Sequence, residues 1–285
     1  SAALNALMHM DEDRAMPVLA QVMERRDECA APLRRRAVFI IADKGGAEAV
    51  DLLLEAARND PDREVRRQAV FWLSEADDPR AVEALVDMVA RSDDEALRER
   101  AVFALGQSDS PRARAALRRV AGDTDAPVDL RRRAVFWIGE NGGADDVRFI
   151  QGLFPTGDAA LDERILFAVG EAGGAGSGDW LLRVAADADV DPTLRKRAVF
   201  WAAEAGAPAD ALGALYESTR APDMKERILF ALSESPEDAA MDHLIRIARE
   251  EQDHDLRRRA IFWLGNSSDP RAADALMDLL ARPRQ

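Results

Sequence analysis

The sequence has 285 residues, of which 47% are apolar and 32% charged, enough apolar residues for the core of two ordinary domains or of one elongated array. Its 39 Lys and Arg against 53 Asp and Glu give a net charge of −14, which disfavours non-specific binding to nucleic acid. The single cysteine, Cys29, excludes a disulfide framework and a Cys-rich metal site, and no apolar run approaches the ~20 residues of a membrane span.

The first predicted element is a helix over residues 2–10, inside the opening SAALNALMHMDEDR. This opening lacks the charged n-region of a signal peptide, so no secretion signal is predicted and the compartment stays open. The apolar residues of the helix follow the pattern of an element that recurs further along the chain. We therefore interpret residues 2–10 as a terminal half-repeat.

From residue 33 onward one string of residues recurs, and each copy contains a phenylalanine that lies 30 to 33 residues after the previous one. A near-constant period of this size indicates stacked supersecondary units. The strings are LRRRAVFII, VRRQAVFWL, LRERAVFAL, LRRRAVFWI, LDERILFAV, LRKRAVFWA, MKERILFAL and LRRRAIFWL, beginning at residues 33, 65, 97, 130, 161, 194, 224 and 256.

Each unit is predicted to contain two helices. The string itself has apolar residues at helical spacing, as at Leu130, Ala134, Trp137 and Ile138, and we name this helix B. A second amphipathic run, helix A, lies between successive strings, for example over residues 81–90, 145–154 and 239–248. Asp-Pro, Ser-Pro and Gly-Gly pairs mark the turns between them. The last element, over residues 270–282, is an A helix without a following B helix.

The pattern resembles HEAT repeats, in the short HEAT-like form common in bacteria. The shared motif is Leu-Arg-x-x-Ala, followed four residues later by an apolar residue and often glycine, as in the stretch Leu130–Gly139. The strings that begin at 97 and 256 match in the same way. Together the period and the resemblance predict an all-α, right-handed α–α solenoid (a superhelix) of about eight two-helix repeats plus terminal half-repeats, with the B helices lining its concave layer. Neither end has an obvious polar cap, so we expect residues 1–285 to be a single solenoid that is a fragment or a domain of a longer chain.

Two positions of the string alternate from repeat to repeat. Counting the first residue as position zero, position seven is tryptophan in the even-numbered strings and isoleucine or alanine in the odd ones, which predicts core packing of a large side chain beside a small one, such as Trp137 against Ala104 or Ala168. Position two alternates in charge along the array, so adjacent B helices are expected to offer opposite charges side by side. The position-two residues are Arg67, Glu99, Arg132, Glu163, Lys196, Glu226 and Arg258.

Position three is mostly arginine and position ten mostly glutamate, which predicts either Arg–Glu ladders between repeats or a row of ligand-binding groups. Position six is always phenylalanine, on the side of the helix where a polar residue is usual. A row of exposed rings would be an interaction surface. The alternative is that each ring lies against the next B helix, covered by arginine stems.

No motif for catalysis, cofactor binding or metal binding is evident. The three histidines, His9, His243 and His254, are scattered, and no His-Glu pairs of the kind found in HEAT-like iron hydroxylases occur. The charge pattern argues against HEAT-like DNA glycosylases, and no motif of the HEAT-like bilin lyases is recognised. The Gly-rich segment 173–178 lacks the Lys-Ser/Thr of a P-loop and is interpreted as a turn, and Cys29 as a free structural thiol.

The sequence therefore predicts a non-enzymatic scaffold that binds a protein or peptide with basic and apolar residues on its concave face, without nucleic acid, membrane insertion or a cofactor. The alternatives are a HEAT-like lyase or enzyme accessory subunit, and a spacer domain of a larger sensor or peptidase-like protein. The oligomeric state is left open. The residues predicted to contact the partner are Phe103, Phe136, Phe167, Phe200, Phe230, Glu75, Glu140, Glu171, Glu204 and Glu234.

Overall fold

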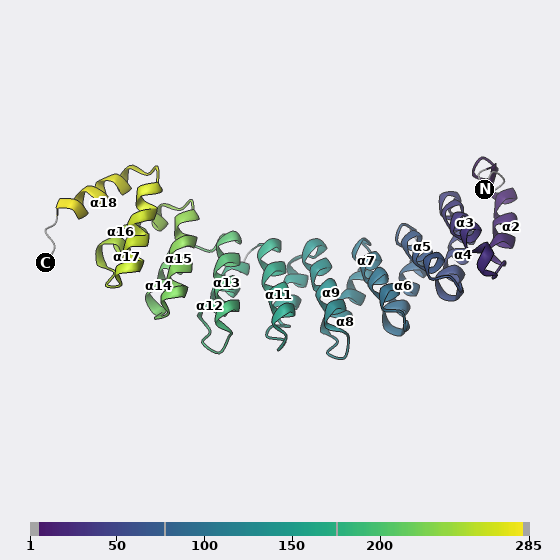
Figure 1. The fold of residues 1–285 in the computed structure, drawn as a ribbon, viewed down its shortest axis with the longest axis horizontal. Helices are drawn as coiled ribbons and strands as arrows, with labels where there is room; N and C mark the ends of the chain where they lie inside the picture. Colours follow the sequence, from purple (N-terminus) through teal and green to yellow (C-terminus); the bar gives the residue numbers. More distant parts are fainter. Residues whose placement is uncertain (1–5, 77, 175, 282–285) are drawn as a thin grey trace. The chain divides into compact units, whose positions relative to one another are not determined.

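The computed structural model describes residues 6–76, 78–174 and 176–281, and contains helices without strands over these ranges. The chain divides into two compact units, Ser1–Gly142 and Gly143–Gln285. Each unit is a stack of antiparallel helix pairs, which Figure 1 shows in chain order. None of the described helices is both long and apolar enough to cross a lipid bilayer.

In the first unit the B helices contact one another in one layer, and the A helices contact one another in a second layer. A short 3-10 helix, η1 (Glu28–Ala30), precedes the first B helix. The B helices are α3 (Ala31–Lys44), α5 (Arg63–Ser74), α7 (Glu95–Gly106) and α9 (Val128–Asn141), and the A helices are α2 (Glu12–Met23), α4 (Gly46–Asn59), α6 (Pro79–Arg91) and α8 (Pro111–Gly122).

The second unit repeats this arrangement and ends on an A helix. Its B helices are α11 (Ala159–Ala172), α13 (Pro192–Glu204), α15 (Pro222–Glu234) and α17 (His254–Asn266), and its A helices are α10 (Ala144–Gln151), α12 (Ser177–Ala186), α14 (Ala209–Ser218), α16 (Asp238–Glu250) and α18 (Pro270–Ala281). The prediction of an all-α solenoid of two-helix repeats is thus confirmed.

The predicted terminal half-repeats are present as far as the structure describes them. Residues 6–8 are helical and Leu7 is buried, while residues 2–5 lie outside the described part of the chain. Helix α18 matches the predicted final A helix, and residue 282 again lies outside the described part. The prediction for residues 145–154 was too long, because α10 ends at Gln151. Gly152 follows, and Phe154 precedes a proline, which disfavours helical backbone at that residue.

Aspartates fix where the helices begin. Three residues before its string, Asp62 accepts a hydrogen bond from the backbone N–H of Val65 at 3.0 Å, which satisfies one of the free donors at the start of α5. In the turn before α6, Asp78 accepts from the N–H of Arg80 at 2.8 Å and Pro79 occupies the first helical turn, where a missing N–H costs nothing. The Asp-Pro turns predicted from the sequence therefore act as helix starts.

The arginine at position one of the string closes the end of the preceding A helix, a role that the sequence analysis did not recognise. Arg131 Nε donates to the carbonyl oxygen of Ala121 at 3.1 Å, and Arg195 Nε donates to that of Ala185 at 2.8 Å. The last carbonyls of a helix have no partner within the helix and carry its negative dipole end, so a cation is favourable there. These contacts tie α9 and α13 to the A helices of their own repeats.

Position one of the first string forms a buried ion pair. Arg34 and Asp60 are both buried, and Arg34 Nε lies 2.8 Å from Asp60 Oδ2. Arg34 also donates to the carbonyl oxygens of Arg25 and Asp27, so its donors are satisfied. A buried charge is tolerated because its partner and hydrogen bonds replace the lost water.

The core lies between the two layers. In α9, Leu130, Ala134, Val135 and Ile138 are buried, whereas Arg133 on the same helix is exposed. The corresponding positions of the other strings follow the same pattern, so positions zero, four, five and eight of the string form the core. Positions two, three, six and ten lie outside this core and form a surface that we name the B face.

Candidate partner-binding face

The phenylalanines at position six are partly exposed along the B face. Phe103 has 37% of its surface exposed, and Phe262, in the last described B helix, has 59%. The others are half-buried, so the row is neither a fully exposed surface nor a buried core. These half-buried rings are Phe39, Phe71, Phe136, Phe167, Phe200 and Phe230.

Each even-numbered string packs its tryptophan against the odd-numbered string before it. Trp137 contacts Phe103 edge to face, with ring centroids 5.4 Å apart, and contacts Phe136 of its own helix at 5.1 Å. The pairs Phe39–Trp72, Phe167–Trp201 and Phe230–Trp263 repeat the contact between strings at 5.6, 5.1 and 5.7 Å. Edge-to-face rings at this separation attract one another beyond the area they bury.

The tryptophans at position seven pack beside small residues, and the structure identifies one small partner that the sequence analysis did not name. A β-carbon added to Gly106, at position nine of the preceding string, would overlap the Trp137 ring, and one added to Gly170 would lie 2.8 Å from Trp201 Cβ. Trp137 and Trp201 therefore lie directly on the glycine at position nine of the preceding string. They are also half-buried rather than fully buried, because their rings lie at the border between the core and the B face.

Three ion pairs between neighbouring B helices join position two of one string to position three of the next. Glu99 of the third string pairs with Arg133 of the fourth at 3.2 Å. Glu163–Arg197 and Glu226–Arg259 repeat this pair at 3.0 and 2.9 Å. The predicted pairing of opposite charges at position two does not occur among these residues, nor does the predicted ladder between positions three and ten. Arg67 instead pairs with Glu64 within its own helix.

The alternation at position two determines which arginines at position three find a carboxylate. The fourth, sixth and eighth strings follow a string with glutamate at position two, whereas the third, fifth and seventh follow a string with arginine or lysine there. Arg227, in the seventh string, follows Lys196, and its guanidinium lies over the rings of Phe200 and Phe230 at 5.0 and 5.5 Å. Arg100, in the third string, lies over Phe71 and Phe103 in the same way at 5.6 and 5.8 Å.

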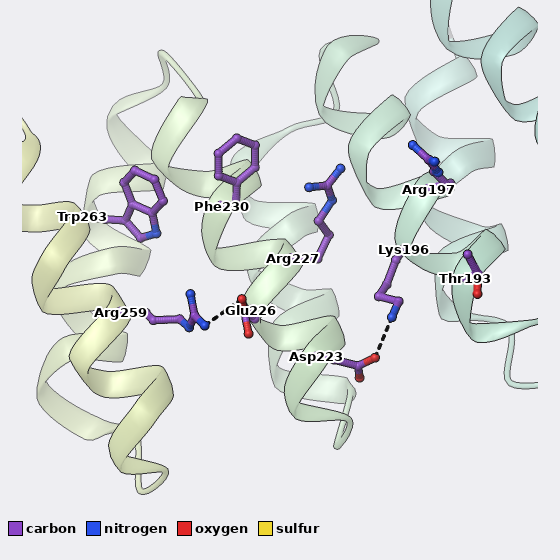
Figure 2. Close-up of a pocket in the computed structure, with 9 residues that line it drawn as sticks. All are labelled: Thr193, Lys196, Arg197, Asp223, Glu226, Arg227, Phe230, Arg259 and Trp263. Carbon is purple, nitrogen blue, oxygen red and sulfur yellow. Dashed lines mark hydrogen bonds and ion pairs between the residues drawn. The ribbon is translucent and has the colours of Figure 1, made fainter.

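A groove of about 490 Å³ opens on the B face of the second unit, over α13, α15 and α17 (Figure 2). Phe230 and Trp263 supply its apolar surface. Two of its ion pairs are internal, since Lys196 Nζ lies 2.9 Å from Asp223 Oδ2 and Arg259 pairs with Glu226. The hydrogen bond from Lys196 lowers the pKa of Asp223 below its usual value. The residues that line the groove are Thr193, Lys196, Arg197, Asp223, Glu226, Arg227, Phe230, Arg259 and Trp263.

The glutamates at position ten form a separate row at the C-terminal ends of the B helices. All five that were predicted to contact a partner are exposed, and none forms an ion pair within the described residues. They do not line the groove. The structure thus brings Phe230 into the groove and Phe200 against Arg227, but leaves the predicted glutamates outside the groove. These are Glu75, Glu140, Glu171, Glu204 and Glu234.

The groove residues other than Phe230 were not predicted as a site. The available signal was the arginine three residues before the phenylalanine in every string but the second, because side chains at this spacing lie on one helix face. Whether such an arginine meets a ring or a carboxylate depends on the neighbouring helix.

The remaining sequence features show no reactive arrangement. Within the described ranges, no group of three or more His, Cys, Asp or Glu side chains is placed to hold a metal ion.

Of the predicted scattered histidines, His243 contacts a carboxylate, since its Nε2 lies 2.9 Å from Asp210 Oδ1. Cys29 is free, as predicted, and exposed. Gly173 and Gly174 have positive φ in the predicted turn, but the next helix begins at Ser177, within the Gly-rich segment.

Two families match the chain. HEAT repeats match residues 26–101 and 50–139, and the PBS lyase HEAT-like repeat matches residues 256–282. This chain is a HEAT-like repeat protein. No curated protein sequence matches it.

Solved structures share the fold of this HEAT-like repeat protein at low sequence identity. Lipovitellin is 14% identical with a TM-score of 0.54, covering 94% of this chain and 30% of its own. A homology model of the AP-3 complex in an intermediate open conformation is 14% identical with a TM-score of 0.50, covering 98% of this chain and 56% of its own. The complex of CpcE and CpcF of phycocyanin lyase from Nostoc is 18% identical with a TM-score of 0.39, covering 87% and 94%. At these identities the likeness to the first two shows the fold alone.

Proposed function

We propose that this HEAT-like repeat protein is a non-enzymatic scaffold that binds a polypeptide along the B face of its helix stacks. The observation that carries the proposal is the combination of partly exposed phenylalanines and exposed glutamates without ion pairs at regular intervals along that face. Aromatic rings in shallow hollows serve as anchors, and rows of one charge guide the approach of a partner.

The chemistry of the partner is inferred from these two rows. Apolar side chains would contact the phenylalanines, and Lys or Arg side chains would lie along the position-ten glutamates. Repeat proteins use long continuous surfaces of this kind for binding. The net charge of −14 supports a partner that carries basic residues.

The test is selection of peptides from a random phage-displayed library on the intact chain, followed by affinity measurement with the enriched peptides. In the variant Glu171→Gln/Glu204→Gln/Glu234→Gln the fold is undisturbed, because these side chains form no ion pair. We expect the affinity to fall roughly five- to tenfold, with a weaker dependence on salt.

The matched control is Asp179→Asn/Glu250→Gln/Asp274→Asn, which removes the same charge from exposed positions on A helices of the same unit. This variant should bind like the wild type. Equal losses in both variants would mean that only the net charge matters, and the B face would then not be the binding surface. A library that yields no binding peptide would contradict the proposed function as a whole.

A further inference from the structure

Arg227 is a cation without a carboxylate, held in the groove between two aromatic rings. Its guanidinium carbon lies 5.0 Å from the centroid of Phe200 and 5.5 Å from that of Phe230. Within the described residues it forms no ion pair, and Figure 2 shows its guanidinium in the space between Phe230 and Arg197. Half-burial and the nearby Arg197 lower the pKa of Arg227, the direction expected for a guanidinium that lacks a compensating anion.

The other arginines of the groove differ in this respect. Arg197 pairs with Glu163 at 3.0 Å and Arg259 pairs with Glu226 at 2.9 Å. Arg197 and Arg259 each face a glutamate at position two of the preceding string. At that position Arg227 faces Lys196, which itself pairs with Asp223. Arg227 is therefore left as a positive charge beside an apolar surface, in a chain whose net charge is −14.

The geometry restricts what can complete this site. Rings that contact a guanidinium through their faces leave its N–H groups available, and the planar fork of donors matches the two oxygens of a carboxylate. A phosphate carries nearly twice the charge, and Asp223 and Glu226 in the same groove would repel it more strongly than a carboxylate. Nucleic acid is disfavoured by the charge of the whole chain.

We propose that Arg227 binds a carboxylate side chain, Asp or Glu, of the partner polypeptide, with an adjacent apolar side chain of that partner against Phe230 and Trp263. This inference rests on the proposed function and makes it more specific, since it assigns an acidic residue to the segment over the groove. The basic residues of the same partner would lie at the other edge of the B face, along the position-ten glutamates. The partner is then recognised by the order of its charges as well as by its apolar residues.

The experiment uses the phage-selected peptides on the intact chain, measured as fluorescein-labelled synthetic peptides by fluorescence anisotropy. We expect an Asp or Glu beside an apolar residue to be enriched. Arg227→Gln should weaken binding about tenfold to hundredfold, the effect of removing a hydrogen-bonded charge pair. Arg227→Lys should give a smaller loss, because it keeps the charge without the planar fork. Arg249→Gln, which removes a cation from the A helix α16, should bind like the wild type.

A double-mutant cycle separates contact with the peptide from a structural role. If Arg227 contacts the carboxylate, Arg227→Gln should cost little more once that peptide residue is Gln, and Arg227→Glu should recover affinity for a peptide with Lys there. The proposal would be overturned if the affinity losses from Arg227→Gln and from the peptide substitution simply added. It would also be overturned if the selected peptides contained no acidic residue, or if a phosphoserine at that peptide position bound more tightly. Peptides that bind and remain sensitive to the position-ten glutamates, but not to Arg227, would leave the proposed function standing.

Discussion

The junction between the third and fourth strings and the junction between the second and third are built differently, although the strings are alike. At the first, Trp137 lies on Gly106 and Glu99 pairs with Arg133. At the second, Arg100 lies between two phenylalanines and forms no ion pair within the described residues. Phe71 and Phe103 are thus bridged by a cation, whereas Phe103 and Trp137 meet ring to ring.

This difference shows that the structural unit is a pair of repeats. In the pairs formed by the third and fourth strings and by the fifth and sixth strings, an aromatic contact over glycine and a Glu–Arg ion pair hold the two members together. A stacked arginine joins one pair to the next and keeps hydrogen-bond donors available. Stability and binding capacity are therefore assigned to alternate junctions, and substitutions should affect them differently.

The largest effect is expected from Trp137→Ala, which removes the ring contacts within a pair. The free energy of unfolding of the first unit should fall by about 3 kcal/mol, at the lower end for Trp→Ala because the ring is half-buried. Urea denaturation followed by circular dichroism measures this change. The loss should appear first as an earlier transition of part of the chain, since repeats contact only their neighbours. A denaturation curve identical to that of the wild type would show that the Trp–Gly contact does not hold the pair.

A smaller effect is expected from Gly106→Ala, which keeps the tryptophan but fills the space under it. The added methyl group would overlap the Trp137 ring, so the free energy of unfolding should fall by about 1–3 kcal/mol. The control is Gly265→Ala, at the same position of the last string, where a β-carbon meets nothing within 4 Å. Alanine should stabilise that helix by about 0.5–1 kcal/mol, because it loses less backbone entropy on folding than glycine. Equal effects of the two substitutions would refute the pairing.

The smallest effects compare two adjacent residues of α7, Glu99 and Arg100, which face opposite junctions. Glu99→Gln should reduce the free energy of unfolding by about 0.5 kcal/mol, and this difference should vanish at high salt because the Glu99–Arg133 pair is solvent-accessible. Arg100→Gln should cost about 0.5–1 kcal/mol through loss of the contacts with the two rings, and should depend less on salt. Urea denaturation at low and high salt measures both. The same salt response in both variants would mean that the junctions do not differ in kind.

The sequence alone predicted the solenoid, because a string that recurs eight times leaves little choice of element or layer. Helical spacing of Leu130, Ala134 and Ile138 identified the core, and the Asp-Pro pairs identified where A helices begin. The alternation of tryptophan at position seven and of charge at position two also revealed a two-repeat period. The helix and turn signals are local, since each depends on residues within one or two helical turns. The repeat period was visible because the same positions can be compared from string to string.

The tertiary structure decided which positions meet across a junction. Periodicity places Arg227, Phe230 and Glu234 on one side of α15, but not opposite any particular residue of α13 or α17. The register and direction of neighbouring side chains determine that position three faces position two, and that tryptophan lies on position nine. For this reason the predicted ladder between positions three and ten was wrong. The unpaired cation of Arg227 follows from Lys196 being its neighbour, and it became visible only when the helices were placed side by side.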